Sequence, residues 1–310
     1  DHRDLHSFPT RRSSDLLGNR NFRRFLIEVK GESLAEQMRF VRDELGMKQL
    51  ITSLNVHSSI PLMLLRNRFD LVDNHQYWAH PKWFRWPEIL TLNQDSAISA
   101  LAWLPRLMMP TRIFGKPFIV TEFNFCHPNR FRAEGGPLTA AYASLQDWDG
   151  LFRFSWAHDR DLKFGKVYWI TFTTWNDPMQ LLSDRIAALV FRRSDFKPAP
   201  KRYAYRIPEN YFDTKLPFDF PDTFSNLGLV AGIGSVIGNG GEGVRPPVTV
   251  LDPADTVKPD QLRDRKIAEL WNEANEKRIA RSMTGELLLD AGKREFTAVS
   301  PRSELFILSD

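Results

Sequence analysis

The chain has 310 residues, of which 42% are hydrophobic and 26% are charged, and it contains one cysteine. This composition is typical of a globular protein with one large or two smaller domains, and a single cysteine excludes a framework of intrachain disulfides. The net charge of +4 without a long basic run disfavours a nucleic-acid partner, and no apolar stretch approaches the roughly 20 residues of a membrane-spanning helix.

The first sixteen residues, Asp1–Leu16, have no apolar period and no signal-peptide pattern. Their sequence, DHRDLHSFPTRRSSDL, resembles the translation of a common sequencing adapter over its whole length. We therefore expect residues 1–16 to be a non-native segment that replaces native sequence upstream of Leu17. Any secretion signal of the native protein would then be missing.

From Leu17 onward the pattern alternates between helix and strand. Leu34, Met38, Val41 and Leu45 form one face of a helix that Gly46 would end. Apolar runs predict four strands, at Lys48–Asn55, at Phe69–Trp78, in the stretch from Gly115 to Glu122 and at Gly150–Trp156. Helices are predicted around Ala97–Met109, at Leu138–Gln146 and at Pro178–Arg192. Strands that alternate with helices predict a parallel sheet made of βαβ units, and so an α/β fold.

Groups capable of chemistry stand at the end of each predicted strand. Parallel strands of α/β folds carry their functional groups at the carboxyl end, where Glu122 closes an otherwise apolar run. The plain alternative for Glu122 alone is a solvated side chain at a strand exit. The other strands end in Asn55 and His57, in His75 and Tyr77, and in Trp156.

Beyond Asp195 the character of the sequence changes. Several prolines predict a linker, and GIGSVIGNGGEG (Gly232–Gly243) predicts a flexible loop, because its glycine spacing departs from that of a nucleotide-binding turn. Gln261–Arg281 predicts a charged helix or coil. Gly285–Asp290 and Arg294–Pro301 predict two strands of a small β module.

Three stretches, VDNHQYW, FIVTEFN and WDGLFRFSWAH, together resemble the second half of a clan-A glycoside hydrolase of the cellulase-like, family-five type. The resemblance spans roughly Asn19 to Ser303. It implies that residues 17–205 form the C-terminal half of a (β/α)8 TIM barrel, with strands five to eight. Residues 206–310 would then form a linker and a partial β-rich accessory domain.

The resemblance also implies roles for individual residues. Glu122 matches the nucleophile at the end of the seventh strand. His75 and Tyr77 match the catalytic pair at the end of the sixth strand, where the tyrosine hydrogen-bonds the nucleophile. Implied contacts with a carbohydrate substrate come from Asn55 (or His57), Trp78, Trp156 and Trp175. No cofactor, metal or obligate protein partner is implied, and the parent protein would work outside the cytoplasm.

One departure from the family pattern is serious. The acid/base glutamate of the clan follows an asparagine at the end of the fourth strand, whereas the Asn-Glu pairs here, Asn272-Glu273 and Asn275-Glu276, lie late in the chain. We therefore expect this chain to be inactive, although the parent would hydrolyse β-glycosidic bonds with retention. Two alternatives remain open, namely a non-catalytic carbohydrate-binding protein of the same fold and a metal-dependent hydrolase that uses Asp73, His75 and His80. A nucleophilic Cys126 paired with His127 is disfavoured, because adjacent residues rarely face each other.

Overall fold

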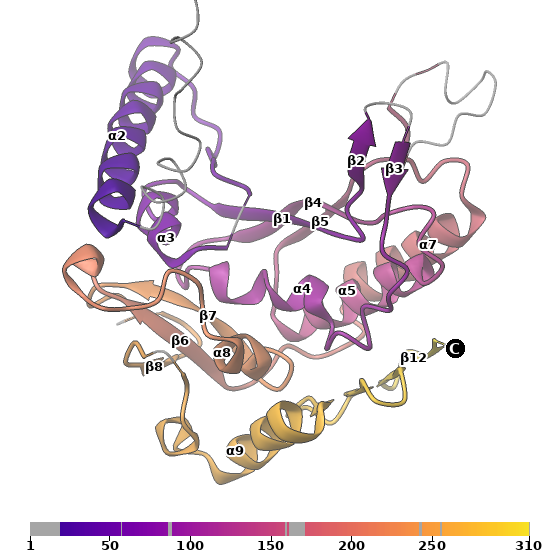
Figure 1. Ribbon diagram of the computed structural model, residues 1–310. Helices are drawn as coiled ribbons and strands as arrows, with labels where there is room; N and C mark the ends of the chain where they lie inside the picture. The colour runs from indigo at the N-terminus through magenta and orange to yellow at the C-terminus, as the bar shows by residue number, and fades with distance from the viewer. Residues whose placement is uncertain are drawn as a thin grey trace, which may run out of the picture.

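The computed structural model describes residues 19–56, 58–85, 89–158, 160, 171–241, 244–254 and 256–309. The fold is mixed α/β, as predicted, and the described residues form two parallel sheets, one four-stranded antiparallel sheet and one antiparallel pair of short strands. The first sheet crosses the middle of the molecule, the second lies below it, and the antiparallel sheet ends the chain (Figure 1). The sheets in the described part of the chain form no closed barrel.

The first sheet has the strand order β1-β4-β5, with β1 at Val72–Trp78, β4 at Phe118–Phe125 and β5 at Gly150–Arg153. All its neighbours run parallel. A register shift after Asn74 brings His75 opposite Glu122. Three of the four predicted strands are therefore confirmed, and Glu122 lies in the second half of the central one.

The fourth predicted strand, Lys48–Asn55, is wrong, because the structure has no strand there. The segment runs beside β1 and makes separate contacts, such as the hydrogen bond from His75 N to Asn55 O at 2.7 Å. Leu54 has a φ of 68°, a conformation that a regular strand cannot contain. The Arg66 guanidinium binds the Leu54 carbonyl and so occupies an acceptor that a sheet ladder would need.

The helices follow the sequence pattern closely in two places. α5 (Gly135–Leu145) confirms the helix predicted at Leu138–Gln146, and α7 (Pro178–Arg192) has the predicted bounds. Both lie on one side of the first sheet and pack against each other (Figure 1). Asp177 caps α7 by accepting a hydrogen bond from Met179 N, and proline fits the first helical position.

The helix predicted around Ala97–Met109 is reduced to one short turn, α4 (Trp103–Arg106), and a following 3-10 turn, η2 (Met109–Thr111). Leu101 and Ala102 have positive φ angles, which interrupt a right-handed helix. The buried Glu134 carboxylate accepts the backbone N–H groups of Ala97 and Ile98. Tertiary hydrogen bonds thus replace those of a helix.

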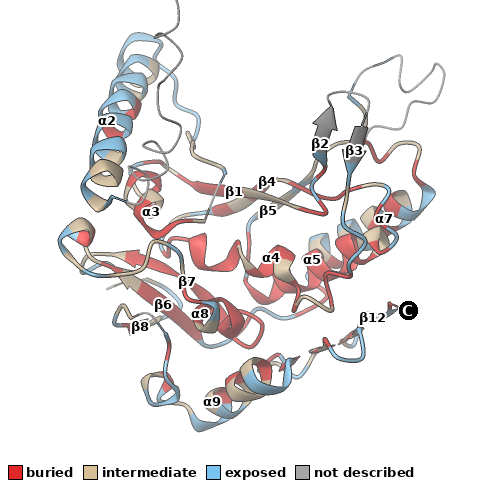
Figure 2. Cartoon of the chain, viewed as in Figure 1, coloured by how far each residue is buried: buried red, intermediate tan, exposed pale blue. Residues whose placement is uncertain are grey.

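The first helix of the described chain, α2 (Arg20–Arg39), continues in a π-helical turn, Phe40–Glu44. Gly46 ends it with a φ of 64°, as the sequence predicted. Only Gly31 and Leu34 of α2 are buried, so most of this helix is exposed (Figure 2). α3 (Ile60–Arg66) packs against α2 and also contacts the parallel sheet that forms later in the chain.

The linker predicted after Asp195 is wrong. The region forms a second parallel sheet of order β7-β6-β8, with β6 at Arg202–Ile207, β7 at Gly232–Ile237 and β8 at Thr249–Leu251. The supposed flexible loop therefore begins as a buried strand, and the predicted boundary between residues 205 and 206 falls inside β6. Gly234 allows the close approach of β7, because a Cβ there would lie 2.9 Å from Arg112 O.

The C-terminal region confirms the predicted β module. β10 (Leu287–Asp290) and β11 (Glu295–Val299) pair in an antiparallel sheet of order β12-β11-β10-β9. Phe296 contacts Tyr142 of α5, with ring centroids 5.7 Å apart, so this antiparallel sheet packs against α5. The remaining elements are β2 (Lys82–Arg85), β3 (Ile89–Thr91), α8 (Asp222–Leu227), α9 (Arg265–Asn272), β9 (Ile279–Arg281), β12 (Glu304–Leu308), the 3-10 turns η3 (Arg132–Glu134), η4 (Tyr211–Asp213) and η5 (Pro259–Leu262), and the π-helical turn η6 (Glu273–Lys277).

The core lies between the first sheet, its helices and the second sheet, where most residues are buried (Figure 2). Leu50, beside β1, is 65% exposed, and Phe152, on β5, is 57% exposed. A parallel sheet is normally covered on both faces, so apolar side chains this exposed are unusual on such a sheet. Within the described ranges, no helix combines the length and apolar character that crossing a membrane requires.

Candidate functional site

Glu122, Tyr77 and His75 meet on one face of the first sheet. Tyr77 Oη donates a hydrogen bond to Glu122 Oε2, and His75 Nδ1 lies 3.3 Å from the same oxygen. The parallel register brings β1 and β4 side by side, with the three side chains near their carboxyl ends. The Glu122 side chain keeps 30% of its surface exposed, so it remains accessible to a ligand.

Tyr77 is held as a hydrogen-bond donor. Burial raises the pKa of its phenol, and the hydrogen bond to Glu122 raises it further. Its ring packs edge-on against Phe172 and His80, with centroid distances of 5.0 and 5.4 Å, and Phe154 lies 6.3 Å away. The phenol therefore stays protonated at neutral pH and directs its hydrogen towards the carboxylate.

The two predicted tryptophans after β5 form a pair. The rings of Trp156 and Trp175 lie 5.2 Å apart at an interplanar angle of 58°. Trp156 is 52% exposed, which is high for a side chain this apolar. Phe154 lies two residues before Trp156, and Phe172 lies three residues before Trp175. Both phenylalanines contact Tyr77, so the tryptophan pair belongs to the same end of the sheet as Glu122.

Two other predicted substrate contacts differ from expectation. Asn55 lies beside the site, where its carbonyl accepts His75 N, so its recorded contact is made by the backbone. Trp78 is buried, packs on Trp103 at 5.8 Å and donates its indole N–H to Asp95 O. Alternation along β1 turns Trp78 to the face opposite Tyr77. We therefore assign Trp78 to the core. His57 lies outside the described residues.

Sequence analysis missed several residues around this site. Asn124 lies two residues beyond the predicted strand, in a position that favours a turn over a place in the cleft, but the structure puts it within β4, facing the same side as Glu122. The signal was available, because residues two apart on a strand share a face. The roles of Phe154, Phe172 and His80 around Tyr77 had no sequence signal, since they depend on the path of the loops.

The alternatives based on a metal or on cysteine find little support in the geometry. Asp73 accepts hydrogen bonds from Thr52 Oγ1 at 2.7 Å and from Thr121 Oγ1 at 3.0 Å. Among the described residues, His, Cys, Asp and Glu form no group of three that could hold a metal ion. Cys126 is buried, and burial raises the pKa of its thiol to about 12, which disfavours the nucleophilic thiolate.

The late Asn-Glu pairs do not reach the site. Both lie at the end of α9 and in the π-helical turn η6, in the lower part of the molecule (Figure 1). Glu273 pairs with Arg281, and Asn275 donates to Trp271 O. Asn275 also accepts a hydrogen bond from Asn226 of α8, so these residues connect α9 to its neighbours.

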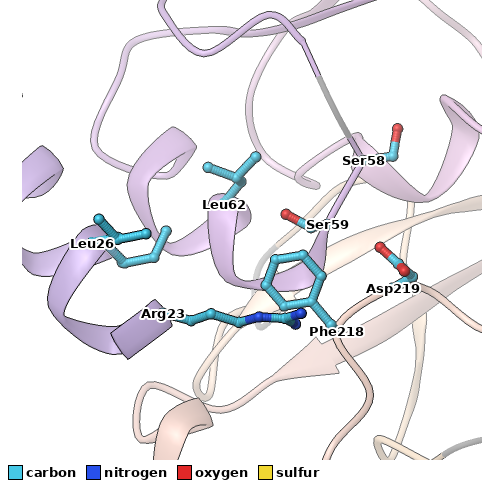
Figure 3. A pocket seen from close by; sticks show the side chains of 8 residues that line it. Arg23, Leu26, Ser58, Ser59, Leu62, Phe218 and Asp219 are labelled. Carbon is cyan, nitrogen blue, oxygen red and sulfur yellow. The ribbon is translucent and has the colours of Figure 1, made fainter. Parts of the chain in front are cut away.

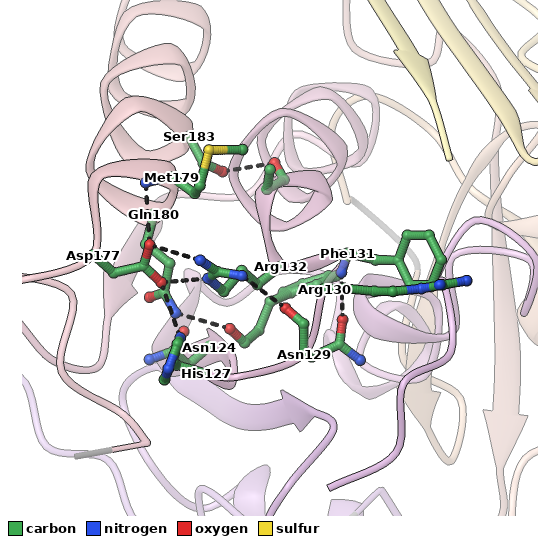
Figure 4. Close-up of polar contacts among 12 residues, drawn as sticks. Asn124, His127, Asn129, Arg130, Phe131, Arg132, Asp177, Met179, Gln180 and Ser183 are labelled. Atoms are coloured by element: carbon green, nitrogen blue, oxygen red, sulfur yellow. Dashed lines mark hydrogen bonds and ion pairs between the residues drawn. The ribbon is translucent and has the colours of Figure 1, made fainter. Parts of the chain in front are cut away.

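A second polar cluster lies behind the strand end (Figure 4). The Asp177 carboxylate pairs with the Arg132 guanidinium, and Oδ2 lies 3.5 Å from His127 Nδ1. Burial alone would raise the pKa of Asp177, but hydrogen bonds from His127 and Arg132 outweigh it and hold the pKa well below its usual value. The cluster joins the turn after β4 to the start of α7, so its role is structural.

A cavity of about 590 Å³ lies elsewhere. It is formed by α2, α3 and the segment before α8 (Figure 3). Arg23 stacks over Phe218 at 4.0 Å, and Leu26, Ile27 and Leu62 make much of the wall. The cavity is mainly apolar and does not include Glu122, so we separate it from the candidate site. Comparison with protein-family models, curated proteins and solved structures found no match for this chain.

Proposed function

We propose that this chain carries the nucleophile half of a retaining glycoside hydrolase site that acts on β-glycosidic bonds. The observation that supports this most is the carboxylate of Glu122, partly exposed at the carboxyl end of a central parallel strand and bonded by Tyr77. The Tyr77 hydroxyl donates its hydrogen to one carboxylate oxygen and so orients the group that would make the nucleophilic attack. The exposed Trp156–Trp175 pair offers an aromatic surface suited to the apolar face of a sugar.

The proposal extends to the fold. The first sheet would be part of a (β/α)8 barrel, because its strands are parallel and their functional groups share the carboxyl end. The exposed apolar side chains of Leu50 and Phe152 would be covered in the complete barrel. In such a barrel the segment at residues 48–55 would take the place of the strand beside β1, which requires Leu54 to adopt an extended conformation and Arg66 to release its carbonyl. The resemblance to clan-A glycoside hydrolases leads to the same arrangement.

A retaining mechanism needs a second carboxyl group about 5–5.5 Å from the nucleophile. In the described part of the chain, the side chains in direct polar contact with Glu122 are those of Tyr77 and His75, and the acid/base glutamate that the family pattern requires has no match in the sequence. Loss of general acid catalysis costs a factor of ~10²–10⁴. We therefore propose that the chain by itself hydrolyses natural oligosaccharides little or not at all.

An activated substrate tests the nucleophile without the missing acid. In a 2,4-dinitrophenyl 2-deoxy-2-fluoro-β-glycoside, a Glu122 oxygen would bond to the anomeric carbon while dinitrophenolate leaves with the electron pair of the broken C–O bond. Because that leaving group needs no proton, we expect slow covalent labelling of Glu122, detected by mass spectrometry of its peptide. Glu122→Gln should abolish labelling. Labelling at another residue, or unchanged labelling of the variant, would contradict the proposal.

The exposed tryptophan pair favours one alternative, a carbohydrate-binding protein of the same fold that performs no catalysis. We expect Trp156→Ala to weaken binding of a β-linked hexasaccharide about tenfold, since loss of an aromatic contact costs on the order of 1 kcal/mol. Calorimetry would measure the affinity, with Phe306→Ala as a control at an exposed aromatic on β12. Binding that depends on Trp156 without any labelling of Glu122 would favour this alternative.

A further inference from the structure

Asn124 is a buried polar residue that the proposed chemistry does not use. It lies on β4, two residues after Glu122, and opposite Tyr77 in the register of the sheet. Its side chain has no exposed surface. Burying an amide is unfavourable unless its groups are hydrogen-bonded, so the contacts that it makes indicate its role.

The Asn124 amide binds two separate segments of the chain, one at Phe154 and one at Phe172, which we call the two limbs. Nδ2 donates to Phe154 O at 2.5 Å and to Phe172 O at 2.8 Å. One amide nitrogen carries two N–H donors, so a single side chain can bind both carbonyls at once. Phe154 follows β5 and Phe172 precedes α7, so the amide binds two segments that are separate in the sequence.

Backbone hydrogen bonds connect these two limbs to the tryptophan pair. Ser155 N donates to Phe172 O, and Trp175 N donates to Trp156 O at 3.0 Å. The rings of Phe154 and Phe172, whose carbonyls Asn124 binds, also pack on Tyr77. Asn124 is thus a common anchor for the tyrosine that bonds Glu122 and for the limbs that present the tryptophans.

We infer that Asn124 is a positioning residue that fixes the Trp156–Trp175 pair relative to the Glu122–Tyr77 pair. By holding both limbs, it sets the distance between an aromatic surface and the reactive carboxylate, and with it the affinity for a carbohydrate. The carbohydrate part rests on the proposed function, whereas the positioning part rests only on the hydrogen bonds.

Asn124→Asp tests the inference, because it replaces the double donor by an oxygen that faces two carbonyl oxygens. Asn129→Asp is a matched control. Asn129 is equally buried, and its Nδ2 also donates to two carbonyls, Asn93 O at 3.0 Å and Asp95 O at 3.2 Å, neither of which belongs to the segments at Phe154 and Phe172. Each variant loses an amide that donates to two carbonyls, but only Asn124→Asp loses the hydrogen bonds to Phe154 O and Phe172 O.

Two measurements are needed. Hydrogen exchange should become at least about tenfold faster at the amides of Ser155, Thr174 and Trp175 in Asn124→Asp, because loss of one or two hydrogen bonds is worth that factor, and should not change there in Asn129→Asp. Calorimetry with cellohexaose, mannohexaose and xylohexaose should show binding weakened about tenfold by the first variant alone.

Unchanged exchange at these three amides in Asn124→Asp, or equal acceleration by both variants, would overturn the inference. Unchanged hexasaccharide affinity in Asn124→Asp would overturn its carbohydrate part. If the wild-type chain binds none of the three hexasaccharides, the proposed function loses its support, and the exchange comparison alone decides the positioning role. If Asn124→Asp does not fold, Asn124→Ser, which keeps one donor, should give a smaller change in the same direction, and no change would contradict the inference.

Discussion

Asp177→Ala is expected to lower the free energy of unfolding by about 3–5 kcal/mol, because it removes one partner of a buried ion pair. The Asp177 side chain is 1% exposed, and without it the Arg132 guanidinium would remain largely buried without its counter-ion. The variant also loses the N-terminal cap of α7. Urea denaturation followed by tryptophan fluorescence and circular dichroism would measure the change.

Asp264→Ala is the matched control for this prediction. Asp264 also caps a helix, α9, and pairs with a basic residue, Lys201, but the pair is far more exposed. Its loss should cost only about 1 kcal/mol, the usual value for a cap. Equal losses in the two variants would mean that burial of the Asp177–Arg132 pair contributes nothing beyond the cap.

The lowered pKa of Asp177 also predicts how stability depends on pH. An unfolded aspartate takes up its proton near pH ~3.9, whereas folded Asp177 does so only at lower pH. The folded state therefore binds fewer protons in this range, and the contribution of Asp177 is fully present above about pH 4 and is lost as the pH falls towards the folded pKa. Asp177→Ala should flatten this acid limb, and an unchanged slope below pH 4 would contradict the assignment.

Gly136→Ala should destabilise the protein by at least about 3 kcal/mol, the upper end of the cost of overpacking. An added Cβ would lie 2.1 Å from Ser183 O and 2.6 Å from the carbonyl carbon, where α5 contacts α7. Backbone cannot move aside as a flexible side chain can. Helix propensity alone predicts the opposite sign, a gain of about 1 kcal/mol for alanine in a helix, so the sign of the change decides which effect wins.

Gly292→Ala provides the control for Gly136. Its added Cβ would meet only Asp290 Oδ1, at 3.4 Å, so the change should stay within about 0.5 kcal/mol of wild type. Thermal unfolding of both variants would give the comparison. A stable Gly136→Ala protein would mean that α5 and α7 can separate without loss, contrary to their close packing.

Much of the first sheet and of the helices beside it could be predicted from the sequence. The bounds of α7 follow from a capping aspartate, a proline and an amphipathic run, all of which act within a few residues. One rule predicted that His75, Tyr77 and Glu122 lie close together, because the carboxyl ends of neighbouring parallel strands lie at the same edge of a sheet. Trp78 was misassigned although its place in the strand, one residue after Tyr77, already put it on the other face.

The second sheet was missed because its cause is long-range. Prolines around β6 favour turns, and the glycines of β7 favour a loop, so local propensity predicted a linker. The structure uses those glycines for close packing, as at Gly234 beside Arg112, and burial outweighs the local preference. The helix predicted around Ala97–Met109 failed in the same way, because the Glu134 carboxylate binds the N–H groups near its start.

The sequence by itself determined the elements whose signals are local, together with a glutamate at the carboxyl end of a buried strand. Only the tertiary structure decided that Phe154 and Phe172 pack around Tyr77, and that the buried Asn124 binds the backbone at both of these residues. The physical reason is that helix caps and strand periods depend on neighbours in the chain. Hydrogen bonds between segments depend on register and loop path, which form only when the whole core packs.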